Sequence, residues 1–369
     1  MDARTFETAA RRWEGLGPYY AMFPTRFADE VISRHSRPGD VVLDPFAGRG
    51  TAVFSAAHQG RISLGIEINS VGWVYAKTKI DAAPADAVAV RIAALGDVSN
   101  SFSREADSLP NFFHRCYCIR VREFLCAARA TLSWQVDKVD RTVMALLLVY
   151  LHGKLGAALS NQMRQTKSMA PDYAIRWWAE RELDPPDLDP VAFMVSRLKW
   201  RYAKGVPDVR GSEILLGDSQ EQLPLVADTL KRRRKRVSLI FTSPPYFALT
   251  NYHYDQWLRL WLLGGPPTAH RVPGTQDLRG RFENEPRYRR LLESVFAASS
   301  STLSRKSTVY VRTGSDPITL DATVAALRSA FPRHAVDQRK RPYTRPTQTS
   351  LFGDSSVKAG EVDLILTRE

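Results

Sequence analysis

The sequence predicts an α/β fold in which a mainly parallel sheet is interrupted by a large helical insertion. Short apolar runs that end in turn residues recur in the first 80 residues and again after residue 212. Such runs are typical of strands buried on both faces of a parallel sheet. Between about residues 82 and 207 the strand patterns vanish and helical periodicity dominates. A chain of 369 residues is long enough for a large α/β domain with such an insertion, or for two domains.

The N-terminal part has the pattern of a βαβ unit. A short helix is expected over residues 26–36, followed by a turn at Arg37-Pro-Gly-Asp40. The next segment, Val41-Val-Leu-Asp-Pro-Phe-Ala-Gly-Arg-Gly-Thr51, predicts a strand that runs into a glycine loop. A helix over residues 52–59 and a second strand over residues 62–67 complete the unit.

The middle of the chain is predicted to be helical. The periodic segments cover residues 112–132, 141–159, 173–181 and 191–202, and the linkers between them are rich in proline. We therefore assign residues 1–81 and 208–369 to the α/β domain and residues 82–207 to an insertion. Strand patterns resume at residues 213–218, 237–241 and 307–312, with two closing strands around Ala335 and over residues 362–367.

The strand over residues 237–241 is apolar and ends abruptly at Thr242-Ser-Pro-Pro-Tyr246. Proline removes a backbone donor and fixes φ, so Pro244 and Pro245 predict a rigid turn at the carboxyl end of the strand. In open α/β sheets that edge is where ligands bind. The turn offers a hydroxyl, carbonyl oxygens and an aromatic ring, a set that suits a planar base with an exocyclic amine.

Acidic residues are expected at the carboxyl ends of three strands. The loop over residues 44–51 lacks the third glycine of a dinucleotide fingerprint, since that position is Val53, and Asp44 would repel a pyrophosphate. This acidic loop better fits a cationic ligand with an amino-acid tail, such as S-adenosylmethionine. Glu67 could bind both ribose hydroxyls of that ligand. Asp218 could accept from an adenine amino group or cap the following helix.

Composition points to a polyanionic partner and to a soluble protein. The formal net charge is +13 and the pI is about 9.8, which favours nucleic acid over a membrane surface, although a merely basic protein is the alternative. The longest apolar run, residues 143–151, is too short to span a bilayer, and the polar N-terminus has no apolar leader segment. Three sparse cysteines fit a reducing compartment. We expect a cytoplasmic protein without a membrane partner.

Two basic segments stand out in the C-terminal half. The run over residues 231–236 precedes the strand at 237–241, so it is expected at the sheet edge opposite the ligand site. A solvated loop at a helix end is the favoured interpretation, with a remote phosphate contact as the alternative. The loop over residues 339–345 is better placed to reach the ligand side.

These motifs resemble those of the amino-methyltransferases of DNA, which methylate cytosine N4 or adenine N6. Residues 44–51 are similar to the cofactor loop of that family, residues 242–246 to its catalytic motif, and residues 23–30 to its additional cofactor-side motif. The resemblance covers roughly residues 19–80 and 212–369. It implies a Rossmann-like, seven-stranded methyltransferase sheet, S-adenosylmethionine as cofactor, and a target base flipped out of double-stranded DNA. The position of the insertion departs from the common family layouts, which makes residues 82–207 a candidate target-recognition domain.

The resemblance also implies roles for individual residues. Ser243 and the Pro244 carbonyl would accept hydrogen bonds from the exocyclic amine, and Tyr246 would stack on the flipped base. The implied catalytic set is Ser243, Pro244, Pro245 and Tyr246, and the implied cofactor-binding set is Pro24, Thr25, Asp44, Phe46, Gly48, Gly50, Thr51, Glu67 and Asp218. No metal site is expected.

The identity of the acceptor is left open by the motif. A serine at position 243 favours cytosine N4 over adenine N6, and C5 methylation is disfavoured because the chain has no Pro-Cys pair. RNA and protein amides are alternative acceptors, and a non-enzymatic DNA-binding protein is a further alternative. Associated restriction or defence components are conceivable partners. Within the insertion, residues 161–167 offer donors for base edges or form an ordinary polar loop between helices.

Overall fold

The computed structural model describes residues 6–18, 23–209, 211–248, 252–269, 284–341 and 360–368. Its centre is a seven-stranded sheet in the order β3-β2-β1-β4-β5-β7-β6, so the predicted α/β class with seven strands is confirmed. The strands are β1 Val41–Asp44, β2 Ile62–Glu67, β3 Glu213–Leu216, β4 Val237–Thr242, β5 Leu303–Gly314, β6 His334–Arg341 and β7 Glu361–Arg368. β7 is antiparallel to both neighbours, whereas the five strands from β3 to β5 run parallel.

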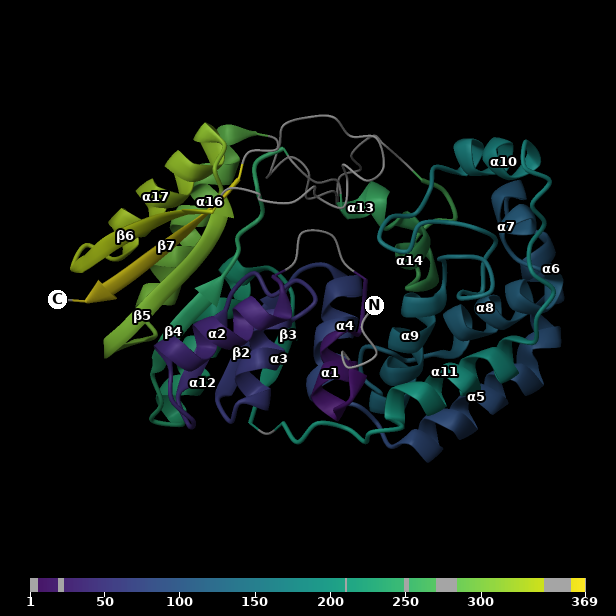
Figure 1. Ribbon diagram of the computed structural model, residues 1–369, viewed down its shortest axis with the longest axis horizontal. Helices are drawn as coiled ribbons and strands as arrows, with labels where there is room; N and C mark the ends of the chain where they lie inside the picture. Colours follow the sequence, from purple (N-terminus) through teal and green to yellow (C-terminus); the bar gives the residue numbers. More distant parts are fainter. Residues whose placement is uncertain are drawn as a thin grey trace.

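Two helical layers cover the sheet, because alternate residues of its strands are apolar on both faces. One face packs against α12 Ser219–Arg232, α16 Glu285–Ser300 and α17 Pro317–Ala330. The other packs against α2 Thr25–His35 and α3 Thr51–His58, where Phe241 of β4 stacks on Phe23 at 4.7 Å between ring centroids. Figure 1 shows the sheet with its helices on one side of the molecule and the insertion on the other.

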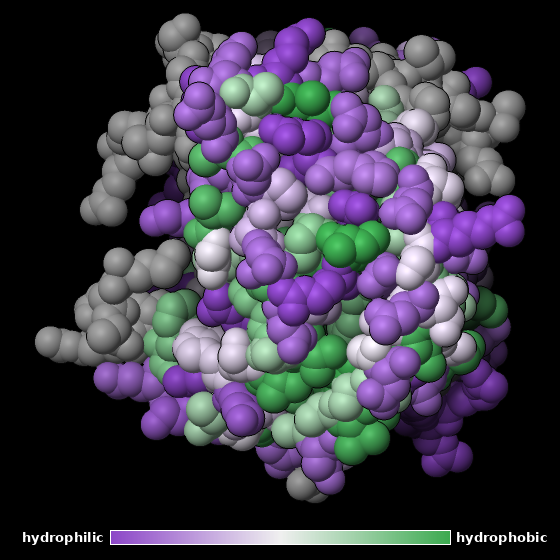
Figure 2. Space-filling view, turned by 90° about the vertical axis from the view of Figure 1, so that its right-hand side faces the viewer, coloured by the Kyte–Doolittle hydropathy of each residue, from purple (hydrophilic) through white to green (hydrophobic). Residues whose placement is uncertain are grey.

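The insertion lies between α4 Ser70–Ile80 and β3 and consists of helices in the described residues. They are α5 Ala85–Ser99, a 3₁₀ turn Asn100–Phe102, α6 Ser103–Asp107, α7 Asn111–Cys116, α8 Ile119–Thr131, α9 Lys138–Tyr150, α10 Pro171–Ala179 and α11 Pro190–Tyr202. Three short helices lie outside it: α1 Ala9–Glu14, α13 Tyr252–Asp255 and α14 Trp257–Leu262. The outer face of the insertion mixes apolar groups with charged ones (Figure 2), and Val90 on α5 is 71% exposed.

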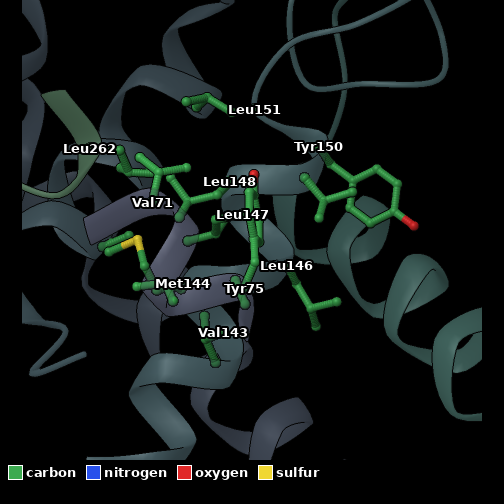
Figure 3. Packing of buried hydrophobic residues seen from close by; sticks show 14 of the residues in the cluster. Val71, Tyr75, Val143, Met144, Leu146, Leu147, Leu148, Tyr150, Leu151 and Leu262 are labelled. Carbon is green, nitrogen blue, oxygen red and sulfur yellow. The ribbon is translucent and has the colours of Figure 1, made fainter. Parts of the chain in front are cut away.

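The insertion does not have a hydrophobic core separate from the α4 side of the sheet. Val71 and Tyr75 of α4 share one buried cluster with residues of α9 and with Leu262 of α14 (Figure 3). α14 follows the 242–246 turn in the chain, so a segment from the C-terminal half of the protein is embedded among helices of the insertion. The division into two domains at residues 81 and 208 stays a prediction.

Two helices of the insertion differ from the predicted spans. The helix expected over residues 112–132 is broken at Tyr117, because the backbone N–H of Asn161 donates to the Cys116 carbonyl at 2.7 Å and ends α7. The helix expected over residues 141–159 ends at Tyr150, and the chain continues as a loop. The first break depends on a contact between distant segments, which the sequence pattern could not show, whereas the second precedes a loop that contains Gly156 at φ +76°.

Candidate active site at the carboxyl edge of the sheet

The site is built where the chain order of the strands reverses, between β1 and β4. β1 pairs with β2 on one side and with β4 on the other, so the connections that leave β1 and β4 diverge to opposite parts of the molecule. A crevice at the carboxyl ends of the strands is the usual ligand site of such a sheet. The predicted cofactor loop follows β1, and the predicted catalytic turn follows β4.

Asp44 joins these two segments. Its carboxylate accepts a hydrogen bond of 2.6 Å from the Thr242 hydroxyl and one of 3.1 Å from the Phe46 backbone N–H. Both Asp44 and Thr242 are buried, and burial raises the pKa of Asp44 to about 7 against these hydrogen bonds. The end of β1 and the last residue of β4 are therefore held together by a single side-chain bond.

The glycine loop has the tight geometry that its sequence predicts. Gly48 and Gly50 have φ values of +54° and +74°, a left-handed conformation that a side chain would strain. A Cβ atom at Gly50 would lie 2.7 Å from the Cβ of Ala76 on α4. Thr51 is buried as the first residue of α3. Only glycine at position 50 permits this close packing of the loop on α4.

Glu67 closes the loop from the end of β2. Its carboxylate accepts 2.6 Å and 2.7 Å hydrogen bonds from the backbone N–H groups of Gly48 and Asn69. Burial raises the pKa of Glu67 to about 7, and the negative charge of Asp44 adds to the effect. Among the described residues, no Lys, Arg or His forms an ion pair with Glu67 or Asp44. Two buried acids thus face this loop without a compensating cation.

Asp218 caps α12, one of the two roles left open by the sequence. Its side chain accepts from the Gln220 backbone N–H at 3.0 Å and is half-buried. The neighbouring Ser219 hydroxyl donates to the Pro45 carbonyl, which brings the start of α12 against the glycine loop. Asp218 therefore lies at the same edge as Asp44 and Glu67, while a contact with an adenine ring stays a prediction.

The remaining predicted cofactor residues, Thr25, Pro24 and Phe46, lie in different surroundings. Thr25 begins α2 and lines a small cavity together with Thr51. Pro24 precedes Thr25 and is exposed. The ring of Phe46 packs with the α12–α16 layer, and its centroid lies 6.5 Å from that of Phe296. Pro24 and Phe46 thus lie at the margins of the group formed by the other predicted residues.

The 242–246 turn is fixed from behind by two helices. The Tyr288 hydroxyl of α16 donates to the Pro245 carbonyl at 2.9 Å, and the Phe247 N–H donates to the Thr319 hydroxyl of α17 at 3.1 Å. Pro244 is buried and Ser243 is half-buried. Within the described parts of the chain, the Ser243 hydroxyl and the Pro244 carbonyl make no hydrogen bond. The turn therefore holds two polar acceptors rigidly and leaves them available.

Tyr246 is held by residues that the sequence motifs do not reveal. Its hydroxyl donates to Glu361 of β7 at 3.3 Å, and its ring lies beside Gly314, where a Cβ atom would come within 3.4 Å of Tyr246 Cδ2. Arg312 of β5 links Glu361 (3.4 Å) to Asp363 (2.7 Å). Burial raises the pKa of Glu361, and Arg312 opposes that shift.

Segment 161–167 of the insertion is largely engaged within the protein. Asn161 is fully buried, and its side-chain amide donates to the carbonyls of Arg115 and Leu183 at 3.2 and 2.9 Å. Lys167 forms a 2.9 Å ion pair with Asp255, just before α14. Asn161 is therefore not available to a base edge in this conformation, whereas base-edge or phosphate contacts by the rest of the segment stay a prediction. The polar-loop alternative agrees with these contacts.

A family model described as DNA methylase, of the N6/N4 type, matches residues 4–73. This segment contains the glycine loop, Asp44 and Glu67. The N-terminal part of the chain is therefore similar to the DNA amino-methyltransferase family. The matched segment is the N-terminal part alone, and the catalytic turn after β4 lies outside it.

Curated proteins match this chain over short segments. It is 32% identical to the type II methyltransferase M.MjaII of Methanocaldococcus jannaschii over 80 residues, which is 22% of this chain and 15% of the relative. It is 38% identical to M.HpaI of Haemophilus parainfluenzae over 64 residues, 17% and 20% of the two chains. The DNA adenine methyltransferase YhdJ of Escherichia coli matches at 46% over 55 residues, 14% and 19%. The matches thus span about a fifth or less of each of these relatives.

The comparison with solved structures gives a distant similarity. The rRNA methyltransferase aviRa of Streptomyces viridochromogenes shares 12% identity, with 100% of this chain and 93% of that chain covered and a TM-score of 0.36. Among the described residues, no cluster of His, Cys, Asp or Glu could hold a metal ion. None of the helices in the described ranges is long and apolar enough to cross a membrane.

Proposed function

We propose that this chain is a DNA methyltransferase that transfers a methyl group from S-adenosylmethionine to an exocyclic amine, with cytosine N4 as the favoured target. The observation that carries the proposal is the bond between Thr242 and Asp44. Through this bond the buried acid after β1 contacts the residue that directly precedes Ser243. A methyl donor and an amine could therefore meet at one edge of the sheet.

The two buried acids after β1 and β2 fit the chemistry of the methyl donor. Asp44 and Glu67 are buried with a raised pKa, and no described cation pairs with either carboxylate. A ligand that carries a sulfonium, an ammonium group and ribose hydroxyls would supply both the positive charge and the hydrogen bonds that these acids lack. Glu67 would bind ribose hydroxyls, and the loop from Gly48 to Thr51 would hold the amino-acid tail. When bound, S-adenosylmethionine would supply an already activated methyl group.

The turn after β4 fits an exocyclic amine. The Ser243 hydroxyl and the Pro244 carbonyl can each accept one amine hydrogen, which increases the electron density on the nitrogen that attacks the methyl group. Two prolines and the bonds from Tyr288 and Thr319 fix the turn, so little reorganisation is needed when the amine arrives. A base inside a duplex cannot reach this turn, so it must be flipped out, and Tyr246 supplies a ring on which it can stack.

Chemistry through a cysteine nucleophile is disfavoured. Cys116 and Cys126 are buried in helices of the insertion, and burial raises the pKa of Cys126 to about 11. A thiolate is the reactive form of cysteine, so neither side chain suits an attack on C6 of cytosine. Methylation of C5 would need such an attack. An amine nucleophile needs no covalent intermediate with the protein.

The proposal also covers which base is methylated and which molecules the chain binds. Serine at position 243 favours cytosine N4 over adenine N6. Double-stranded DNA is the proposed substrate, with the insertion at residues 82–207 as the domain that reads the target. Associated restriction components are a further expectation.

Two variants test the catalytic assignment. Ser243→Ala removes one acceptor, and Tyr246→Ala removes the stacking surface; each is expected to lower methyl transfer to duplex DNA by about 100-fold or more, as the loss of one preorganised contact does elsewhere. Binding of S-adenosylmethionine, measured by calorimetry, is expected to be unchanged. Ser301→Ala, an exposed serine before β5, is the matched control. Native turnover in both site variants would refute the roles of Ser243 and Tyr246.

The acceptor class needs a separate experiment. The chain is incubated with tritiated S-adenosylmethionine and with duplex DNA, structured RNA or total protein, each freed of existing methylation. Label is expected in DNA and is expected to depend on Ser243. Label that enters only RNA or only protein would keep the site chemistry and overturn the choice of DNA.

A further inference from the structure

The amino edge of the sheet, opposite the candidate active site, gathers unpaired positive charge from four separate segments. We call this surface the basic edge. It consists of residues 231–236, Arg305, Lys306, Arg333 and Arg368, all of which are exposed. The stretches that supply them, 231–236, 301–307, 332–336 and 366–368, contain no Asp or Glu. They hold most of the chain's excess charge of +13.

Strand register makes the basic edge continuous. Val237, which directly follows the 231–236 run, pairs with Leu303 at the start of β5. Thr308 of β5 pairs with Thr367 of β7, and Arg368 pairs with His334 of β6. Since neighbouring strands lie about 4.8 Å apart, these positions follow one another along a single edge. The Arg236 guanidinium also donates to the Ser301 carbonyl at 2.8 Å, which ties the run to the start of β5.

Several cations of the insertion have an acidic partner. In the insertion, Arg91 pairs with Asp140, Arg120 with Asp187 and Lys138 with Asp81. In contrast, none of the cations of the basic edge forms an ion pair with a described carboxylate. His334 lies between Arg333 and Arg368 along a shallow cavity. Both nitrogens of its ring are buried without a hydrogen-bond partner.

The chemistry of this surface fits the phosphate backbone of a duplex. Exposed Lys and Arg side chains without a fixed partner suit a polyanion whose charges are evenly spaced. A membrane surface or an acidic protein partner would also need apolar or aromatic anchors. The four stretches that form the basic edge contribute no exposed large apolar side chain among the described residues.

The basic edge lies too far from the active site to contact the same stretch of duplex that the active site holds. β4 runs from the basic edge to the ligand edge in 6 residues, which is roughly 20 Å at about 3.3 Å per residue. DNA has a persistence length of about 150 base pairs, so bending one duplex around this distance is costly. Figure 1 shows the end of β7, the start of β5 and α12 on the side of the molecule away from the insertion.

We propose that the basic edge binds the backbone of a second duplex segment while the catalytic turn engages its target, so that one protein molecule bridges two DNA segments. The first of these two contacts rests on the proposed function, and the second does not. Binding at the basic edge would be independent of sequence and would weaken steeply with salt, because each phosphate contact releases counterions.

The test uses the full chain and two short duplexes, one that carries a fluorophore and one that carries biotin. Native protein is expected to retain the fluorescent duplex on beads coated with the biotinylated one. The triple variant Lys231→Gln, Arg233→Gln, Arg305→Gln is expected to lose this retention. Its log–log salt slope for non-specific DNA binding is expected to fall by up to about 3 units, close to 0.9 for each lost phosphate contact. Methyl transfer to a single short duplex should not change.

The matched control removes equal charge elsewhere. Arg34→Gln, Arg287→Gln, Arg290→Gln changes three exposed cations of α2 and α16, outside both the basic edge and the insertion, and it should bridge like the native chain. Equal loss of bridging in the control, or native bridging by the basic-edge variant, would overturn the proposal. Native affinity of the basic edge for polyglutamate instead of DNA would also overturn it. Bridging by a chain that methylates no DNA would contradict only the proposed function.

Discussion

The two halves of the candidate site differ in whether their acidic side chains have cationic partners. On the β1–β2 side, Asp44 and Glu67 are buried acids without a described cation partner, and both have a pKa of about 7. On the β4–β7 side, Glu361 and Asp363 are paired with Arg312 and Arg341, and the turn presents neutral acceptors. In the first half no described cation compensates the two carboxylates, whereas in the second half arginines compensate them.

This difference in charge compensation indicates which ligand each half can bind. Buried carboxylates are costly unless they are protonated or compensated, so the acidic half suits a cationic ligand. A neutral turn with free acceptors suits an uncharged amine. Among the described residues, the Thr242–Asp44 bond is the single side-chain hydrogen bond between the two halves, and it adds to the backbone pairing of β1 with β4.

The largest expected effect comes from removing charge on the acidic half. Glu67→Gln keeps an acceptor for the Gly48 N–H but removes the carboxylate, and affinity for S-adenosylmethionine should fall by about 100-fold, the range of a lost charged hydrogen bond with its pairing. Thermal stability at pH 8 should not fall, because a buried charge is also removed. Glu221→Gln on the exposed face of α12 is the control, and unchanged affinity in Glu67→Gln would contradict the comparison.

The pH dependence of stability and of cofactor affinity tests the role of the two buried acids. The pKa values of Asp44 and Glu67 rise from 3.8 and 4.5 to about 7 in the fold, so between about pH 4 and pH 7 the folded chain binds more protons than the unfolded chain. Their contribution to the free energy of unfolding therefore decreases as pH rises through this window. A cationic ligand prefers both acids ionised, so its affinity should rise about tenfold per acid between pH 6 and pH 8. Calorimetry in buffers of different ionisation enthalpy should detect proton release, and pH-independent affinity would contradict this account.

Removing the Thr242–Asp44 hydrogen bond should moderately lower both the affinity for S-adenosylmethionine and the rate of methyl transfer. Thr242→Val keeps the size of the side chain but removes the 2.6 Å bond to Asp44, at a cost of about 1–3 kcal/mol in the free energy of unfolding. Affinity for S-adenosylmethionine and the rate of methyl transfer should both fall, whereas Ser243→Ala lowers only the rate. Thr308→Val on β5, which the described contacts leave without a side-chain bond, serves as the control. Denaturant unfolding and single-turnover kinetics measure the two effects.

The smallest effect is expected on the neutral half. Glu361→Gln retains a hydrogen bond to Tyr246 but leaves Arg312 with one carboxylate fewer. The affinity for duplex DNA should change by about threefold, in line with roughly 0.5–1 kcal/mol for a partly exposed pair. Affinity for S-adenosylmethionine should not change. An effect on that affinity as large as that of Glu67→Gln would show that the two halves are not independent.

The sequence predicted the βαβ start, the strands and the edge at which the acids and the Pro-Pro turn meet, because these features depend on local patterns. Strand ends bring Asp44, Glu67 and Asp218 together once the order of the sheet is known. The sequence could not reveal Thr242 as the link, Glu361 as the partner of Tyr246, or α14 inside the insertion. Each of these depends on a contact between residues that are more than 100 positions apart. The same limit misplaced Asn161, whose polar side chain satisfies buried carbonyls.

One measurement tests the central claim most directly. Unmethylated duplex DNA is treated with the chain and labelled S-adenosylmethionine, digested to nucleosides and separated by mass-detected chromatography. We predict label on an exocyclic amine, as N4-methylcytosine first and N6-methyladenine second, and its loss in Ser243→Ala. Label on cytosine C5, or unlabelled DNA despite bound S-adenosylmethionine, would contradict the account.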